Sequence, residues 1–222
     1  MLPIGLPYHH GALREALIDA TEALLAEKGP DAFSLREVAR RAGVSPAAPA
    51  HHFGDAAGLL TAVATLGFEG LTRALQAGHA RGGNDPRAAL REQGIEYVRF
   101  ALRHPGRFRL MFRPGQLHAD AELEHHGRAA YDVLATGVRL ALAGAESAHT
   151  PVVVALWSLV HGHAHLAIAG KLDALTGGRA LPDWIDDTLP GLLDATLQGL
   201  LPKPRRVSRD RSGSPPAGPT DG

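Results

Sequence analysis

Residues 34–53, SLREVARRAGVSPAAPAHHF, combine side chains that donate hydrogen bonds to anions with several very small side chains. The guanidinium of Arg36, the hydroxyl of Ser45 and the rings of His51 and His52 can all donate to phosphate oxygens. Backbone N–H groups at a helix start favour the same anions. The alanines allow a close backbone approach, and an alanine methyl can contact the C5-methyl of thymine. This combination points to the phosphates and base edges of a nucleic acid.

Two helices separated by a tight turn should present these groups. Ser34 and Glu37 have the spacing of a capping box, which predicts a helix start at residue 35. Gly43 suits a turn conformation that other residues resist, and Ser45 followed by Pro46 predicts a second, short helix. This order is typical of a helix-turn-helix, although a helical hairpin inside a larger core has the same pattern. The groups expected to contact DNA are Arg36, Ser45, Pro46, Ala47, Ala48, Ala50, His51 and His52.

The rest of the chain repeats apolar residues at helical spacing, without a convincing alternating strand. Asp55 and Asp85 precede two of these segments as expected N-caps. The sequence GHARGGNDP at 78–86 predicts a break between an N-terminal module and a larger body. The predicted fold class is all-α, with helices over approximately 13–28, 35–42, 46–53, 55–76, 86–102, 120–143, 150–175 and 183–200, and a short segment at 107–112.

Composition narrows the classes of function. The 222 residues carry 23 basic and 23 acidic side chains, so the net charge of the chain does not indicate a nucleic-acid partner. Cysteine is absent, which excludes disulfides, thiol catalysis and cysteine-based zinc sites. The sequence has no phosphate-cradling glycine loop or nucleophile elbow and does not indicate an enzyme. Residues 202–222 have five basic against two acidic side chains and little apolar content, which predicts a disordered basic tail.

An apolar stretch over 152–172, VVVALWSLVHGHAHLAIAGKL, is long enough to cross a bilayer. His161, His163 and His165 lie near its middle, where ionisable groups are costly in lipid, so burial within a dimer is favoured over a membrane span. His161 and His165 also have a spacing that could hold a metal, but no nearby acid or cysteine completes a set. We therefore expect structural histidines, with neither a metal nor a cofactor. No secretory signal is visible, which favours the cytoplasm.

The segments YHHGALREALIDATEALLAEKG and FSLREVARRAGVSPAAPAHHFGDAAGLL together resemble the N-terminal domain of the TetR family of transcriptional regulators. The likeness covers residues 8 to about 65. In the C-terminal half, WSLVHG and YVRFALRHPGRFRLMF resemble the TetR subgroup named for a Trp-His-Gly motif. The chain departs from the family pattern at Ala50, where members usually carry tyrosine, and at Ala56, where they usually carry lysine. Both departures imply fewer contacts to the DNA backbone, which His51 and His52 would offset in part.

The resemblance implies a three-helix helix-turn-helix DNA-binding domain at 8–55, a connecting helix at 55–77, and a helical effector-binding and dimerisation domain at 84–201. The implied partners are a palindromic operator in double-stranded DNA, a small apolar effector of unknown identity and a second copy of the chain. We expect the pocket to contain Tyr97, Phe100, Phe108, Met111, Tyr131, Trp157 and His161, and the dimer interface to contain Val153, Leu156, Leu189, Leu193 and Leu197. These features predict a ligand-responsive repressor. The alternative is a helical interaction or ligand-binding module without specific DNA recognition.

Overall fold

The computed structural model describes residues 10–202, and every regular element in that range is a helix, which confirms the all-α prediction. The α-helices are α1 (His10–Lys28), α2 (Leu35–Arg41), α3 (Ala48–Phe53), α4 (Ala56–Gly82), α5 (Pro86–Arg103), α6 (Pro105–Met111), α7 (Ala121–Leu142), α8 (His149–Ile168) and α9 (Leu181–Leu200). Short 3-10 turns are η1 (Pro30–Ala32), η2 (Pro114–Gln116), η3 (Glu146–Ala148) and η4 (Asp173–Leu175). Residues 8 and 9 of the expected DNA-binding domain and residues 203–222 of the expected tail lie outside the described residues.

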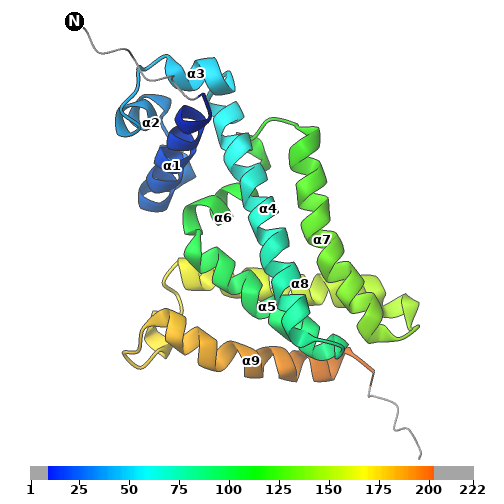
Figure 1. Cartoon of the computed structure of the whole chain (residues 1–222). Coiled ribbons are helices and arrows are strands. Elements are labelled where there is room, and N and C mark those ends of the chain that lie inside the picture. Colours follow the sequence, from blue (N-terminus) through cyan, green and yellow to red (C-terminus); the bar gives the residue numbers. More distant parts are fainter. Residues whose placement is uncertain (1–9, 203–222) are drawn as a thin grey trace, which may run out of the picture.

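Helices α1, α2 and α3 form a small head at one end of the molecule (Figure 1). Leu17, Leu24 and Leu25 of α1 and Val38 of α2 are fully buried. Helix α1 contacts α2 and α4, and α3 packs on the same two helices. The apolar spacing that predicts α1 therefore marks the face that builds the core of the head.

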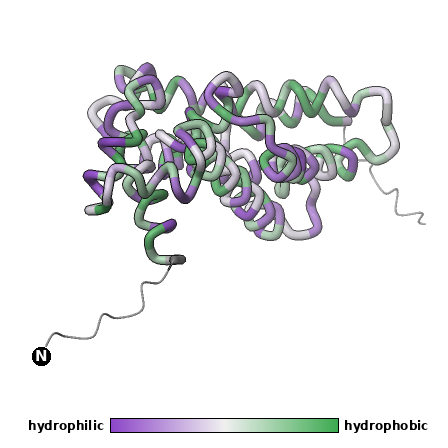
Figure 2. The backbone as a smooth tube through the Cα atoms, turned by 90° about the horizontal axis from the view of Figure 1, so that it is seen from above, coloured by the Kyte–Doolittle hydropathy of each residue, from purple (hydrophilic) through white to green (hydrophobic). Residues whose placement is uncertain are grey.

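Helix α4 leaves the head and runs through the length of the body (Figure 1). It packs against α5 and α7, while α8 and α9 in turn pack on α5. One continuous set of buried apolar residues links the two parts, from Leu17 in α1 to Leu193 in α9. Figure 2 shows hydrophobic and hydrophilic residues alternating along most helices, as the packing of amphipathic helices requires.

The end of α4 differs from the prediction, which places it near Gln76. The helix continues to Gly82, through the glycines that the sequence marks as a break. A Cβ atom at Gly78 would lie 2.7 Å from the backbone oxygen of Glu92, and one at Gly82 would lie 2.2 Å from the Cα of Ala89. These glycines are helical because they allow α4 and α5 to pack backbone to backbone.

A second close contact joins the head to the body. Gly106, near the start of α6, lies against α1, where an added Cβ would be 2.5 Å from the backbone nitrogen of Ala26. Arg107 forms an ion pair with Glu22 of α1 beside it. The position of the head therefore depends on α6 as well as on α4.

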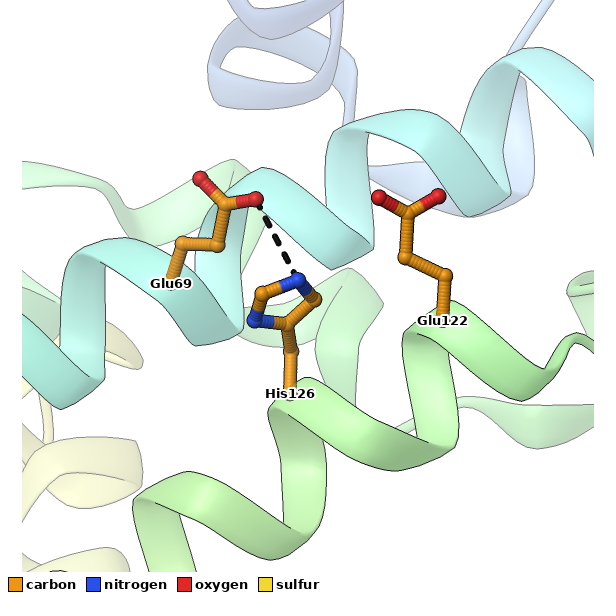
Figure 3. Close-up of side chains that lie close together, drawn as sticks. All are labelled: Glu69, Glu122 and His126. Carbon is orange, nitrogen blue, oxygen red and sulfur yellow. Dashed lines mark ion pairs between the residues drawn. The ribbon is translucent and has the colours of Figure 1, made fainter.

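Helices α4 and α7 pack extensively, and two of their contacts involve residues that are neighbours in the sequence. His126 of α7 faces Glu69 of α4, with 3.4 Å between Nε2 and Oε1 (Figure 3). The next residue, Gly127, lies against the ring of Phe68, which would be 3.9 Å from an added Cβ. An added Cβ at Gly127 would make an ordinary van der Waals contact with this ring, so the helices pack side chain to backbone here.

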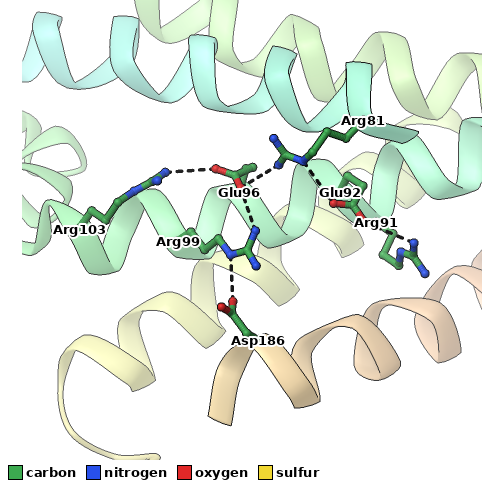
Figure 4. A network of polar contacts seen from close by, with 7 residues as sticks. All are labelled: Arg81, Arg91, Glu92, Glu96, Arg99, Arg103 and Asp186. Carbon is green, nitrogen blue, oxygen red and sulfur yellow. Dashed lines mark hydrogen bonds and ion pairs between the residues drawn. The ribbon is translucent and has the colours of Figure 1, made fainter. Parts of the chain in front are cut away.

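A network of arginines and carboxylates fastens α4 and α9 to α5. Glu96 of α5 is only 8% exposed, and Arg81 of α4 and Arg103 reach its carboxylate at 2.8 and 3.1 Å (Figure 4). Arg99 bridges the same carboxylate, at 3.1 Å, to Asp186 of α9, at 2.9 Å. A buried carboxylate requires such partners, because an unpaired charge at this place would strongly destabilise the fold.

The predicted helix caps have different outcomes. The carboxylates of Asp55 and Asp85 accept hydrogen bonds from first-turn N–H groups at 2.8 and 2.9 Å, so both N-cap predictions are confirmed. The prediction of capping-box hydrogen bonds at Ser34 and Glu37 is wrong. The side chain of Ser34 makes no cap hydrogen bond, and the carboxylate of Glu37 binds neighbouring arginines instead.

Helix α8 ends at Ile168 rather than near residue 175, because Gly170 takes a φ of 68° that turns the chain. By length and composition, it is the one described helix that could cross a membrane. It packs against α5 and α7 on one side and exposes Val154 and Leu166 on another.

The apolar stripe predicted to join two subunits is buried within one chain. All five of its residues are at most 5% exposed: Val153, Leu156, Leu189, Leu193 and Leu197. These side chains therefore pack within one chain, because an apolar stripe marks burial without identifying the partner. The large apolar side chains that α8 and α9 expose are instead Val154, Trp157, Leu166 and Leu192.

Candidate functional site

The helix-turn-helix has the predicted order of elements, but its second helix begins late. Gly43 takes a positive φ of 68° in the turn, and Val44 packs against the core, as the sequence predicts. Helix α3 begins at Ala48, so Ser45 and Pro46 lie in the turn and Ser45 is not the N-cap.

Pro49 explains the late start of α3. An α-helix capped at Ser45 would need the N–H of residue 49 to reach the carbonyl of Ser45, and proline has no N–H. The N–H of Ala48 donates to that carbonyl instead, at 3.0 Å, which closes a tighter turn. Pro49 itself is buried at the second position of α3, where the missing donor is least costly.

The residues at and before α3 form a surface of small side chains. Five of the expected DNA contacts are exposed there: Ser45, Pro46, Ala47, Ala50 and His51. Two more, Ala48 and His52, are half-buried. Phe53 closes the helix and carries the guanidinium of Arg14 over its ring at 5.5 Å. A flat surface of this kind permits close approach to a groove.

The three arginines of α2 differ in their availability. Arg40 donates to Glu37 at 2.9 and 2.7 Å, and Arg41 donates to Glu27 and Glu37 at 2.7 to 3.0 Å. Hydrogen bonds from Arg40, then from Arg41, lower the pKa of Glu37 to about 2. Arg36 is exposed, and no carboxylate within residues 10–202 pairs with it. Arg36 is therefore the arginine of α2 that is ready to meet an external anion.

A cavity of about 310 Å³ lies within the body between α4, α5, α7, α8 and α9. Three of the residues expected in a pocket line it: Tyr97, Tyr131 and Trp157. Tyr131 and Trp157 are 41% and 40% exposed, and their ring centroids lie 6.4 Å apart. This exposed aromatic pair marks the side on which the cavity meets the surface.

The other expected pocket residues are placed differently. Phe100, Phe108 and Met111, which the sequence also predicts in a pocket, do not line this cavity. Phe100 packs against Gly70, Met111 fills the space beside Gly67, and Phe108 lies edge-on behind Tyr97. Apolar spacing identifies a buried side chain, but it does not distinguish core packing from the wall of a cavity.

His161 does not line the cavity but contacts a residue that does. Its Nδ1 is 2.8 Å from the hydroxyl oxygen of Tyr97, which does line the cavity. Burial raises the pKa of Tyr97, so this hydroxyl stays neutral and is available for hydrogen bonding. His161 therefore fixes the orientation of a polar group on the wall.

Gln93 is a polar cavity residue that the sequence analysis does not single out. It is 2% exposed and lines the cavity from α5. Its Nε2 lies 2.9 Å from Nδ1 of His79, whereas its Oε1 is buried and has no hydrogen-bond partner among the described residues. The available signal is its position, since Leu90, Gln93 and Tyr97 share one face of α5 at helical spacing. A buried acceptor of this kind is costly unless a ligand or water satisfies it.

Three histidines of α8 are held in a largely apolar setting. The ring centroids of His161 and His165 lie 4.5 Å apart, and Phe108 contacts both rings. Burial is the main cause that lowers the pKa of His161, His163 and His165, with smaller effects of His165 on His161 and of Arg109 on His165. Within the described residues, the one group of three potential metal ligands is elsewhere, at Glu69, Glu122 and His126.

Comparisons with known proteins agree with this geometry. Residues 17–63 match the family model described as bacterial regulatory proteins, tetR family, and residues 90–188 match the tetracyclin repressor-like, C-terminal domain. The chain belongs to the TetR family of transcriptional regulators, which confirms the predicted class and excludes the enzyme class. The C-terminal match is to a different C-terminal family from the Trp-His-Gly subgroup, so that finer assignment is not confirmed.

Solved structures show the same fold. A Rhodococcus sp. RHA1 protein with unknown function is 32% identical, with 89% of this chain and all of that chain covered and a TM-score of 0.72. The TetR family transcriptional regulator PfmR from Thermus thermophilus is 20% identical over 82% and 97% of the chains, with a TM-score of 0.63. A TetR variant from Acinetobacter baumannii AYE, in complex with minocycline, is 22% identical over 82% and 93%, with a TM-score of 0.53. No curated protein matches the chain significantly.

His161, His163 and His165 should make the fold sensitive to acid. Because their pKa values lie below the ordinary 6.5, the unfolded chain binds more protons than the folded chain as the pH falls through that value. Their contribution to stability is present above about pH 6.5 and is lost as the pH falls through the folded pKa values. We expect the melting temperature to fall between about pH 7.5 and 5, and to fall less in His165→Gln. His125→Gln, on the exposed face of α7, is the control, and an equal drop in both variants would contradict the assignment.

Proposed function

We propose that this TetR-family regulator is a ligand-responsive repressor that binds a palindromic operator as a homodimer in the cytoplasm. The observation that carries the DNA-binding part is the exposed small-residue surface around α3 beside the unpaired Arg36. On this proposal residues 8–55 bind DNA, residues 55–77 connect, and residues 84–201 bind the effector and the second subunit. A helical ligand-binding module is the alternative, and it predicts no sequence-specific DNA binding.

Backbone contacts to DNA should be few. Ala50 and Ala56 stand where TetR relatives usually carry tyrosine and lysine, and Arg40 and Arg41 are engaged by carboxylates. On this proposal, Arg36, Ser45, the rings of His51 and His52 and the N–H groups around α3 are the groups that anchor the phosphates. A dimer making about six phosphate contacts has a log–log salt slope near −5, and we expect a shallower slope here.

Selection of bound sequences from a random DNA pool tests the operator. We expect an inverted repeat, and the absence of any enriched motif would favour the alternative module. On the selected operator, Arg36→Ala should weaken binding and reduce the salt slope by about 2 for the dimer, because each subunit loses one phosphate contact. Arg40→Ala is the matched control, since Glu37 already holds its guanidinium. Equal slopes for the two variants would remove Arg36 from the DNA contacts.

The dimer interface should use the exposed rather than the buried faces of α8 and α9. Val154 and Leu166 of α8 are 50% and 48% exposed, and Leu192 of α9 is 40% exposed. On α9 the same face as Leu192 carries the exposed Thr188, Ala195 and Gly199, which allow close helix packing. Two copies joined through these faces would form a four-helix contact and bury the exposed leucines and valine.

Leu192→Glu should convert the dimer to a monomer, because two buried like charges would face each other at the two-fold axis. Sedimentation at micromolar concentration measures the change. Leu140→Glu places the same charge on a leucine of α7 that is 54% exposed, and it should stay dimeric. A dimer that survives Leu192→Glu, or is disrupted equally by Leu140→Glu, would place the interface elsewhere.

The effector should be a mostly apolar molecule that carries one hydrogen-bond donor. The cavity wall is built of aliphatic and aromatic side chains, and Oε1 of Gln93 is a buried acceptor without a partner among the described residues. A hydroxyl or N–H on the effector would satisfy it. Phe68, Leu71 and Leu75 of α4 also line the cavity, so an effector that displaces them moves the helix that carries the head. This connection supports release from DNA as the response.

Pairs of apolar compounds that differ by one hydroxyl test this chemistry. We expect the hydroxylated member to bind about 5- to 10-fold more tightly, since one net hydrogen bond is worth about 1 kcal/mol. Gln93→Leu should remove that preference while keeping apolar binding. Quenching of Trp157 in a Trp184→Phe background reports occupancy, because these are the chain's 2 tryptophans. A preference that persists in Gln93→Leu would contradict the role of this amide.

A further inference from the structure

A second candidate site lies on the outside of the α4–α7 pair. Glu69 comes from the middle of α4, and Glu122 and His126 come from one face of α7, one helical turn apart (Figure 3). One ligand atom from each residue lies within 4.8 Å of the other two. Two carboxylates and an imidazole thus converge from helices that are distant in the sequence.

Ion pairing accounts for Glu69 and His126 but not for Glu122. Arg73 approaches Oε2 of Glu69 at 3.6 Å, which leaves Oε1 of Glu69 directed at Nε2 of His126. Glu122 has no ion pair with any residue in the described range. The carboxylates of Glu69 and Glu122 therefore lie close together, while the guanidinium of Arg73 pairs with only one of their oxygens. A further positive charge between the three groups would relieve their repulsion.

We propose that Glu69, Glu122 and His126 bind a divalent transition-metal ion of the Zn²⁺ type. Zinc lies about 2.0–2.1 Å from nitrogen and oxygen ligands, which puts two tetrahedral ligands about 3.4 Å apart. The distance between Nε2 of His126 and Oε1 of Glu69 is 3.4 Å, and a carboxylate oxygen of the exposed Glu122 lies within 4.8 Å of both. The imidazole favours zinc over Mg²⁺ and Ca²⁺, which prefer ligand sets of oxygen alone. Three protein ligands leave a fourth position for water.

The ion would fix α7 to α4 at one end of the cavity. Phe68 and Gly127, the neighbours of Glu69 and His126 in the chain, both line the cavity and contact each other. A bridge between the two helices at this level limits how far α4 can move away from α7. Resting on the proposed function, the metal would then alter operator affinity through the same helix that an effector displaces.

Calorimetric titration with ZnCl₂, without DNA, tests the site in the full chain. We expect one tight site per subunit, weakened roughly 100-fold in His126→Ala, because losing even an outer-shell partner costs about 10–100-fold in metal affinity. His125→Ala is the matched control for adventitious zinc binding, since the chain has 13 histidines and His125 is an exposed neighbour. Glu122→Gln is a second ligand variant that changes an exposed side chain and leaves the packing of α7 intact.

The outcomes separate the possibilities. Loss of the tight site in His126→Ala and Glu122→Gln, with retention in His125→Ala, supports the assignment. Equal zinc affinity in all four proteins, or a wild type without a tight site, overturns it. MgCl₂ should not compete at the zinc concentrations used, and equal competition would also overturn the assignment. Because no DNA is present, failure here leaves the operator proposal untouched, and failure of operator selection leaves the metal site untouched.

Discussion

The backbone contact between α4 and α5 is the constraint on which the remaining structure depends. Gly78 and Gly82 bring the two helices closer than any side chain would allow, and the Glu96 network then locks the same pair to α9. Helix α4 has 27 residues, which makes it about 40 Å long, and its other end carries the head. A small change of angle at the glycines is therefore a large displacement at α3. In the proposed dimer, the distance between the two DNA-binding heads is therefore set by a contact far from the heads themselves.

The same helix connects the cavity to the head. Its middle turns supply Phe68, Leu71 and Leu75 to the cavity, and Gly106 of α6 holds α1 from the side. The head therefore has two attachments, one through α4 and one through α6. Any ligand can act only by the difference in its affinity for the arrangements that these attachments permit. The free energy with which a ligand could shift the head is thus limited to the contacts that it gains with the cavity wall when α4 moves.

The sequence alone predicts the helical fold, because apolar spacing and the aspartate caps are local signals. The turn at Gly43 is predicted for the same reason, since only a residue without a side chain takes that φ at low cost. The ends of α4 and α8 are less predictable. Gly78 and Gly82 have the composition of a loop, and only their contact with α5 explains why they are helical.

The local sequence also does not show which element packs against a buried or an exposed helix face. Leu193 and Leu197 belong to a strong apolar stripe, yet the stripe packs on α5 and lines the cavity. The exposed face of α9 contains threonine, alanine and glycine, and a hydropathy pattern does not identify such a face as an interface. Glu69 and His126 meet only because α4 and α7 pack in one register, so no sequence spacing reveals them. Gln93 is hidden because it follows Arg91 and Glu92 in the chain, and a polar residue in such a run is easily assigned to a solvent-facing position.

The cavity lies inside a single chain, while Val154, Leu166 and Leu192, which α8 and α9 expose, do not line it. Each of these helices therefore has two faces that can mutate independently. Substitutions at Leu156, Val160 or Leu193 reshape the interior, whereas those at Val154 or Leu192 reshape the exterior. On the proposed dimer and effector site, a daughter protein could acquire a new chemical specificity after gene duplication while still exchanging subunits with its parent. Insulating the two copies from each other would require a separate set of changes on the outer faces.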